Sequence, residues 1–204
     1  MKAKLFICFL IFTCLLSSCN SNMEHDAEKV ETLVNMNEFT EKVLQNKILI
    51  DEFYIEMQDN PKTRCIDLPA YENLKKELLP TAQKFIMDIE ISNSDIYEML
   101  GDSVDLAKEK EDILVGILMY ACVLDFGNSM SITRGGTILE CLQEATGIAD
   151  AAFLIGTLSA GTMSKAQIKA AIKLAAKAGG KLALRSAAGV GLVLLAAEVA
   201  YCMS

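Results

Sequence analysis

The sequence of 204 residues contains no tryptophan, only three prolines and a single histidine. His25 lies in a charged stretch near the N-terminus, so no histidine is expected beside a serine or cysteine nucleophile. Glycine-rich phosphate-binding loops, dinucleotide-binding glycine patterns and zinc-protease motifs are also absent from the sequence. These absences argue against an enzyme and predict no cofactor. The remaining route to catalysis is a convergence of carboxylates from separate helices.

The scarcity of helix breakers, together with many Ala, Leu, Ile, Lys and Glu residues, favours helices over strands. Hydrophobic residues make up 52% of the chain, which suffices for one sizeable core or two small ones. We therefore predict an all-α fold. The expected helices cover one or two segments within 22–58, and then 70–79, 81–92, 95–99, 103–126, 164–178 and 181–203. Segment 48–57 is also strand-like in composition, but no second strand is evident to pair with it, so we predict a helix there.

Acidic residues are scarce in the C-terminal third of the chain. Residues 135–204 hold four acids and six Lys or Arg, a net charge of +2, whereas residues 20–134 hold 23 acids and 11 Lys or Arg, a net charge of −12. Opposite charges favour docking of one part on the other. An acidic part also suits a precursor whose basic, apolar end must be kept off membranes. We predict an acidic helical part at 19–134 and a hydrophobic, Ala/Gly-rich basic helical hairpin at 135–204. A charge split without functional meaning is the alternative.

No acid interrupts residues 164–178, where lysine recurs at every fourth position. This lysine row consists of Lys165, Lys169, Lys173 and Lys177. On a helix the row sweeps an arc of about 120°, opposite a face of Ile, Leu and Ala, and Ser164 is a favourable N-cap. Cationic amphipathic helices of this kind lie on anionic lipid, so we predict that the lysine row binds a membrane. A solvated face of a helical bundle is the alternative. Nucleic acid is not expected, because aromatic residues and known recognition motifs are missing.

Charge is missing altogether from residues 186–197. As a helix, the segment 181–203 would measure about 34 Å, which is enough to cross the roughly 30 Å hydrocarbon core of a bilayer. Gly189 and Gly191 lower helix propensity but permit close contact with another helix. We predict that this segment enters a membrane. The alternative is that it forms a buried helix in the core of a soluble bundle.

The N-terminus combines a short basic start, an apolar run over 5–16 and small residues before a cysteine, the pattern of a secretory signal peptide at 1–18. The sequence Leu16-Ser17-Ser18-Cys19 resembles the lipobox of bacterial lipoproteins. This resemblance implies that Cys19 becomes the lipidated N-terminus. Asn20 does not match the aspartate that commonly retains such proteins at the inner membrane, which favours the outer membrane or cell surface. The alternative is an ordinary cleaved secretory signal.

Arginine occurs at only three positions, Arg64, Arg134 and Arg185. The first two lie in predicted loops, and the loop around Arg134 is polar, contains glycine and coincides with the change in charge. Exposed loops are where proteases cut. We therefore predict cleavage after Arg134 or Arg64, of which Arg134 would release residues 135–204 as a unit. A plain turn between helices is the alternative.

Seven cysteines become four once the signal peptide is removed and Cys19 is lipidated. The four that remain are Cys65, Cys122, Cys141 and Cys202. Outside the cytoplasm an even number suggests two disulfides, with three connectivities. Pairing Cys141 with Cys202 would staple the C-terminal segment, whereas pairing across Arg134 would hold two cleaved pieces together. Four buried thiols are the alternative, and the spacings do not resemble a metal site.

The lipobox, the acidic helical part, the arginine loop and the basic apolar segment together resemble the layout of Bacteroidales bacteriocins, lipoprotein precursors that a clostripain-type, Arg-specific protease activates. The resemblance implies an antibacterial, membrane-active toxin, anchored by lipid at the outer membrane or cell surface and secreted after cleavage. Its implied partners are the activating protease and the membrane of a target cell, where insertion is compatible with an oligomer. The alternative is a non-toxic surface lipoprotein that acts as a helical binding or immunity module.

Overall fold

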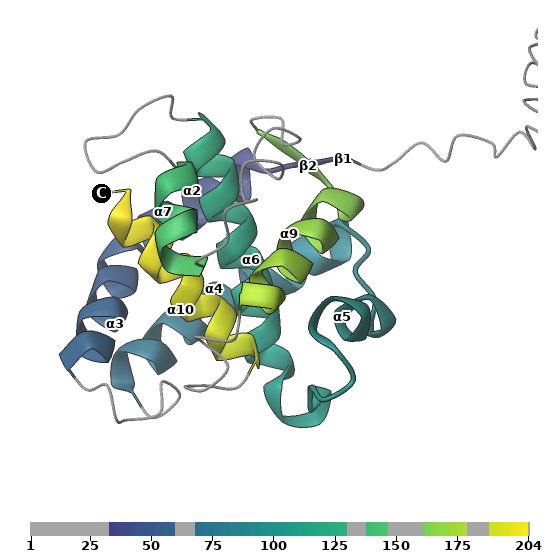
Figure 1. The fold of residues 1–204 in the computed structure, drawn as a ribbon, viewed down its shortest axis with the longest axis horizontal. Helices are drawn as coiled ribbons and strands as arrows, with labels where there is room; N and C mark the ends of the chain where they lie inside the picture. Colours follow the sequence, from purple (N-terminus) through teal and green to yellow (C-terminus); the bar gives the residue numbers. More distant parts are fainter. Residues whose placement is uncertain (1–32, 60–67, 130–137, 147–160, 179–187, 204) are drawn as a thin grey trace, which may run out of the picture. The chain divides into compact units, whose positions relative to one another are not determined.

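The computed structural model describes residues 33–59, 68–129, 138–146, 161–178 and 188–203. Within these ranges the chain forms eight α-helices and one sheet of two short strands, so the predicted all-α class is confirmed (Figure 1). The described segments belong to one unit that extends from Thr32 to Ser204. The predicted signal peptide and Cys19 lie outside the described residues.

Strand β1 (Leu33–Asn35) leads into helix α2 (Asn37–Gln45), and helix α3 (Lys47–Asp59) follows after a single residue. That residue, Asn46, ends α2 because its side-chain amide donates to the carbonyl of Lys42 over 2.9 Å and its backbone N–H donates to the carbonyl of Val43 over 3.0 Å. Val43 of α2 and Phe53 of α3 are buried in the core. The segment with strand-like composition is thus helical, as predicted.

Helix α4 (Pro69–Asp88) begins with a proline in its first turn, where a missing N–H has no helical partner to lose. The predicted break near Pro80 is wrong, because α4 continues through this residue. A proline inside a helix costs about 3 kcal/mol through a lost hydrogen bond and a steric clash. Leu78 and Ala82 flank Pro80 on the buried face and are fully inaccessible to solvent. Packing on both sides of Pro80 therefore offsets the cost of continuing the helix.

Helix α6 (Leu106–Ser129) lies at the centre of the fold, and α10 (Ala188–Cys202) packs along it (Figure 1). Nearly all side chains of α6 between Ile113 and Leu124 are buried, so this helix needs cover on every side, which α2, α4 and α10 provide. Helix α10 begins at Ala188, and residues 181–187 of the apolar helix predicted over 181–203 lie outside the described residues. Among the residues described here, no helix has both the length and the apolar character needed to span a bilayer.

Two short helices, α5 (Asn93–Leu100) and α7 (Ile138–Thr146), precede strand β2 (Thr162–Ser164), which runs directly into helix α9 (Lys165–Ala178). Strand β2 pairs antiparallel with β1 and sets Met163 opposite Val34, both of them buried. These strands were not predicted, because each has three residues and their pairing is long-range. A disulfide between Cys141 and Cys202 joins α7 to the end of α10, which confirms one of the predicted pairings.

Residues on both sides of Arg134 share one hydrophobic core. Helix α10 packs mainly on α6, with further contacts to α7 and α3, whereas α9 packs mainly on α5. The predicted C-terminal hairpin therefore differs from the structure, since α9 and α10 contact each other little and each packs mainly against a helix of the acidic part. The loop of Arg134 lies outside the described residues, and cleavage there stays a prediction.

Candidate functional site

The lysine row is set in place by the first turn of α9. Ser164 precedes the helix and forms a capping box with Gln167: the backbone N–H of Gln167 donates to Ser164 Oγ over 3.3 Å, and the backbone N–H of Ser164 donates to Gln167 Oε1 over 2.8 Å. The N-cap role predicted for Ser164 is thus confirmed. Because Ser164 is also the last residue of β2, the sheet and the cap together fix the direction in which α9 starts.

The chain segment that faces α9 turns sharply between α4 and α5. Glu90 adopts a left-handed conformation with φ of 56°, and two backbone hydrogen bonds of a Schellman motif close the end of α4. The backbone carbonyl of Glu90 accepts a hydrogen bond from Lys165 Nζ over 2.6 Å. Two residues later, Ser92 caps α5: its Oγ accepts from the backbone N–H of Asp95 over 3.2 Å, and its own N–H donates to Asp95 Oδ2 over 2.8 Å.

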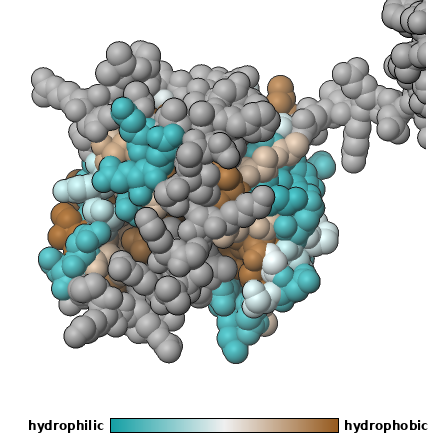
Figure 2. Space-filling view, in the orientation of Figure 1, coloured by the Kyte–Doolittle hydropathy of each residue, from teal (hydrophilic) through white to brown (hydrophobic). Residues whose placement is uncertain are grey.

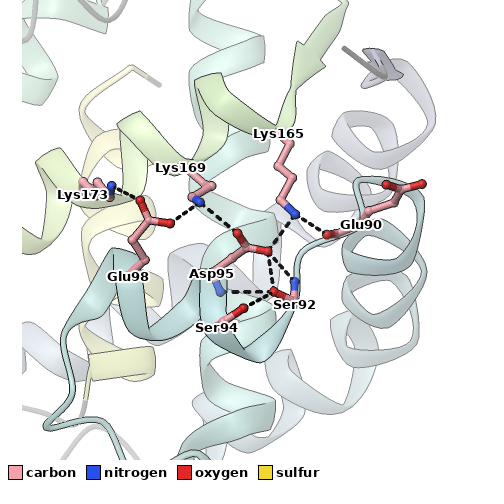
Figure 3. Close-up of polar contacts among 8 residues, drawn as sticks. All are labelled: Glu90, Ser92, Ser94, Asp95, Glu98, Lys165, Lys169 and Lys173. Carbon is pink, nitrogen blue, oxygen red and sulfur yellow. Dashed lines mark hydrogen bonds and ion pairs between the residues drawn. The ribbon is translucent and has the colours of Figure 1, made fainter. Parts of the chain in front are cut away.

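Two carboxylates of α5 alternate with three lysines of α9 (Figure 3). Asp95 pairs with Lys165 over 2.7 Å and with Lys169 over 2.9 Å. Glu98 pairs with Lys169 and, over 2.6 Å, with Lys173. Lysines four residues apart thus interleave with carboxylates three residues apart, so the contacts form one network rather than isolated pairs. We call these five residues the α5–α9 charge network.

Partial burial distinguishes Asp95 and Lys169 from ordinary surface ion pairs, whereas Lys173 and Glu98 are 40% and 51% exposed. The side chains of Asp95 and Lys169 are only 12% and 20% exposed. Burial raises the pKa of Asp95, but hydrogen bonds from Lys165, Lys169 and Ser92 outweigh burial and hold this pKa far below its usual value of 3.8. Hydrogen bonds from Lys169 and Lys173 lower the pKa of Glu98. Both carboxylates are therefore charged at neutral pH and remain so under mildly acidic conditions.

The structure thus brings together three members of the predicted lysine row, and supplies for them the acids that α9 itself lacks. Lys177 lies within α9, but its side chain is outside the described part of the chain. Asp95 and Glu98 were not predicted as site residues, because their partners lie at least 70 residues further along the chain. The only local signal was the Ser92-x-x-Asp95 spacing of a capping box, which marks a helix start and not a partner for α9.

The other predicted sites are distributed as follows. Arg64, Arg134, Cys19 and Cys65 lie outside the described residues, so their predicted roles stay predictions. Cys122 is a free thiol buried in α6, which agrees with the alternative of a buried thiol at this position rather than with a second disulfide. Burial raises its pKa, so this thiol is unreactive.

Figure 2 shows hydrophilic side chains at several places on this face, including its right edge. A shallow groove of about 420 Å³ lies elsewhere, between α2 and α4, and is lined by polar and charged residues that include Glu38, Lys42, Thr81 and Lys84. In the part of the chain that the structure describes, no group of three or more His, Cys, Asp or Glu could hold a metal ion. The α5–α9 charge network is therefore the most distinctive polar feature of the described residues.

No family model, no curated protein and no solved structure matches this chain. Any functional conclusion therefore depends on the residues and contacts described above.

Proposed function

We propose that this chain is the latent precursor of an antibacterial, membrane-active toxin that is exported as a lipoprotein and activated by cleavage after arginine. The observation that carries the proposal is how the C-terminal segment is held. Its most apolar helix, α10, is buried against helices of the acidic part, and its basic helix, α9, is covered by the carboxylates of α5. Both helices that would bind a membrane are thus covered by other helices of the same chain.

The burial of α10 is extensive. Its buried branched side chains are Val190, Leu192, Val193, Leu194, Leu195 and Val199, none more than 6% exposed. Removing one such side chain from water contributes about 1.5–3 kcal/mol, and a bilayer would supply a similar gain. As long as α6 covers α10, insertion into lipid therefore brings no net hydrophobic gain. This is the behaviour that a toxin precursor requires on the surface of the cell that makes it.

Activation requires that cleavage loosen this arrangement. Arg134 falls between α6 and α7, so a cut there separates the acidic part from the segment that carries α9 and α10. The Cys141–Cys202 disulfide lies entirely on the C-terminal side of the cut and would keep α7 attached to α10. Helix α10 would then enter the acyl region, beside a lysine row that contacts lipid phosphate.

The length of α10 limits how it can insert. Its 15 described residues measure about 22 Å as a helix, less than the roughly 30 Å of hydrocarbon core. Spanning the bilayer would require residues 181–187 to join the helix on insertion. Without them, the segment would lie at the interface or thin the bilayer locally.

Dye leakage from vesicles tests this proposal. The lipid-free chain from Asn20 to Ser204, which contains every described residue, is added to vesicles rich in anionic lipid before and after digestion with an Arg-specific protease. Leakage is expected only after digestion, with the cut located by mass spectrometry. Arg134→Lys should abolish leakage, and the matched variant Arg64→Lys should preserve it. The reverse result would move the activation site to Arg64, and no leakage in any state would refute the toxin.

A second function, a helical surface lipoprotein that binds a partner or confers immunity, is favoured by two observations. Both sides of Arg134 contribute to one core, as in an ordinary folded domain, and the groove between α2 and α4 is open to a polar ligand. This alternative predicts a monomer that is indifferent to vesicles whether cut or uncut. It also predicts that cells producing the chain are protected, or unaffected, and that neighbouring cells are never killed.

A further inference from the structure

Helix α5 is a small element attached to one larger partner. It has eight residues, and α9 is the element it contacts most among those described. Glu90 and Gly101, on either side of α5, both have positive φ values, 56° and 92°. Backbone at such positions departs from the regular structure around it. Helix α5 is therefore bounded at each end by a turn that can act as a hinge. It is held in place by the charge network with α9 and by Ile96 and Met99, which are buried in the core.

The carboxylates of α5 accept hydrogen bonds from the lysine side chains, as lipid phosphates would. Ammonium groups donate to carboxylate and to phosphate oxygens with similar geometry, and both acceptors carry negative charge. Lys169 donates to both Asp95 and Glu98, Lys173 donates to Glu98, and Lys165 is engaged by Asp95 and by the carbonyl of Glu90. A lipid headgroup would need the same donors. The carboxylates of α5 and the phosphates of an anionic lipid surface therefore compete for the same ammonium donors.

We propose that α5 is an acidic cover over Lys165, Lys169 and Lys173, and that the phosphates of an anionic lipid surface displace it by competing for these lysines. This inference rests on the membrane-binding role proposed above and adds its regulation. Zwitterionic lipid has little net charge to offer the lysines and leaves the cover in place. Each lysine that becomes available near an anionic surface strengthens binding roughly fivefold.

The test uses the uncut chain, so it does not depend on cleavage. Asp95→Asn combined with Glu98→Gln removes the two negative charges of the cover while keeping the shape of the side chains. The matched control is Glu41→Gln combined with Glu52→Gln, which changes net charge equally on α2 and α3, outside α5 and α9. Co-sedimentation with vesicles of phosphatidylglycerol and phosphatidylcholine is compared with vesicles of phosphatidylcholine alone. Circular dichroism verifies that both variants are folded.

The cover variant should bind the anionic vesicles at least about tenfold more tightly than wild type, and the control variant no more than about twofold. Neither should bind phosphatidylcholine alone. Adding Lys165→Gln, Lys169→Gln and Lys173→Gln to the cover variant should abolish the gain. Equal binding by the cover and control variants would overturn the inference, and so would a gain that persists without the three lysines.

A second measurement avoids substitutions altogether. Hydrogen exchange of the wild-type chain on saturating anionic vesicles should show loss of amide protection in α5, with protection retained in α2. Unchanged protection in α5, or the same loss caused by soluble phosphate or a DNA duplex without lipid, would overturn the inference. A variant that binds vesicles as expected but never causes leakage after cleavage would preserve the cover and refute the toxin. Leakage after cleavage without any gain in binding by the cover variant would refute the cover and support the toxin.

Discussion

Gly116 and Gly189 determine how closely the central helices approach each other. A Cβ atom at Gly116 would lie 2.7 Å from the carbonyl oxygen of Gly189 and 2.7 Å from Cβ of Leu192. A Cβ atom at Gly189 would lie 2.4 Å from the backbone nitrogen of Ile113. These neighbours are backbone atoms, or atoms next to the backbone, so they cannot move aside as the end of a flexible side chain can. The two glycines therefore bring the backbones of α6 and α10 into direct contact.

Substitution of Gly116 tests this contact, because two effects oppose each other. In a helix interior, alanine is favoured over glycine by about 1 kcal/mol. Overpacking in a filled core costs about 1–3 kcal/mol, and here the obstacle is largely backbone. We expect Gly116→Ala to lower the free energy of unfolding by about 1–2 kcal/mol in urea titrations followed by circular dichroism.

A matched substitution isolates helix propensity from packing. Ala176 is exposed on α9, so Ala176→Gly should cost about 1 kcal/mol through propensity alone. If Gly116→Ala stabilises the chain by the amount that Ala176→Gly destabilises it, the two helices do not approach as closely as described.

At the scale of single elements, the contact between α5 and α9 depends on ionised carboxylates. The pKa values of Asp95 and Glu98 are depressed from 3.8 and 4.5, so both groups stabilise the fold at neutral pH. This contribution is fully present above the usual pKa values and is lost as pH falls below them towards the depressed ones. The ion pairs with α9 should therefore contribute most to the free energy of unfolding near neutral pH, and this contribution should fall below about pH 4.

Asp95→Asn measures this dependence, because asparagine keeps an oxygen that can accept in the α5 capping box. The variant should be less stable than wild type by about 1 kcal/mol at pH 7, the scale of partly exposed ion pairs. The difference should persist down to about pH 5 and shrink between pH 4 and pH 2 in urea titrations. Added salt should reduce it at pH 7. A difference that does not change with pH would mean that Asp95 acts through its hydrogen bonds to Ser92 alone.

Elements with local signals were predictable, and elements that depend on distant contacts were not. Ser164 and the spacing of the lysine row gave α9 its correct bounds, since capping and periodicity are local properties. Pro80 led to a false break in α4, because a local rule was overridden by packing on both sides of the proline. Strands β1 and β2 had no signal of their own. Each takes its conformation from a partner strand that is distant in the sequence.

In the candidate site, too, some residues were predictable from local signals and others were not. Its lysines were evident from their spacing, and the charge difference between the two parts indicated that one would dock on the other. The identity of Asp95 and Glu98 was not readable, because many other acids in the acidic part satisfy the same requirement for negative charge. Only the folded path of the chain, with the turn at Glu90, selects these two.

At the scale of the whole molecule, contacts across Arg134 are numerous and, among the described residues, non-covalent. They include the packing of α10 on α6, the pairing of β1 with β2, and the α5–α9 charge network. Asp125 of α6 adds another, since it is buried and accepts a hydrogen bond from the backbone N–H of Gly161 over 2.7 Å. A cut at Arg134 removes the covalent connection but none of these contacts.

We therefore predict that the two fragments stay together after cleavage at Arg134 in plain buffer. The six buried branched side chains of α10 contribute about 1.5–3 kcal/mol each, which is comparable to the roughly 4–15 kcal/mol that association of separate chains costs, and the other contacts add to it. The cut protein should co-elute as one species at the size of the uncut chain. It should separate into two bands on a denaturing gel, with Arg134→Lys as the uncut control.

Anionic vesicles should change this outcome, because they compete for the lysine row and offer α10 an apolar environment. With vesicles present, the C-terminal fragment should sediment with the lipid and leave the acidic fragment in solution. Fragments that separate in buffer without lipid would contradict the prediction, and cleavage alone would then activate the toxin. Fragments that remain together on anionic vesicles would also contradict the prediction. The two fragments would then share a core that lipid does not open, as expected for a surface binding module.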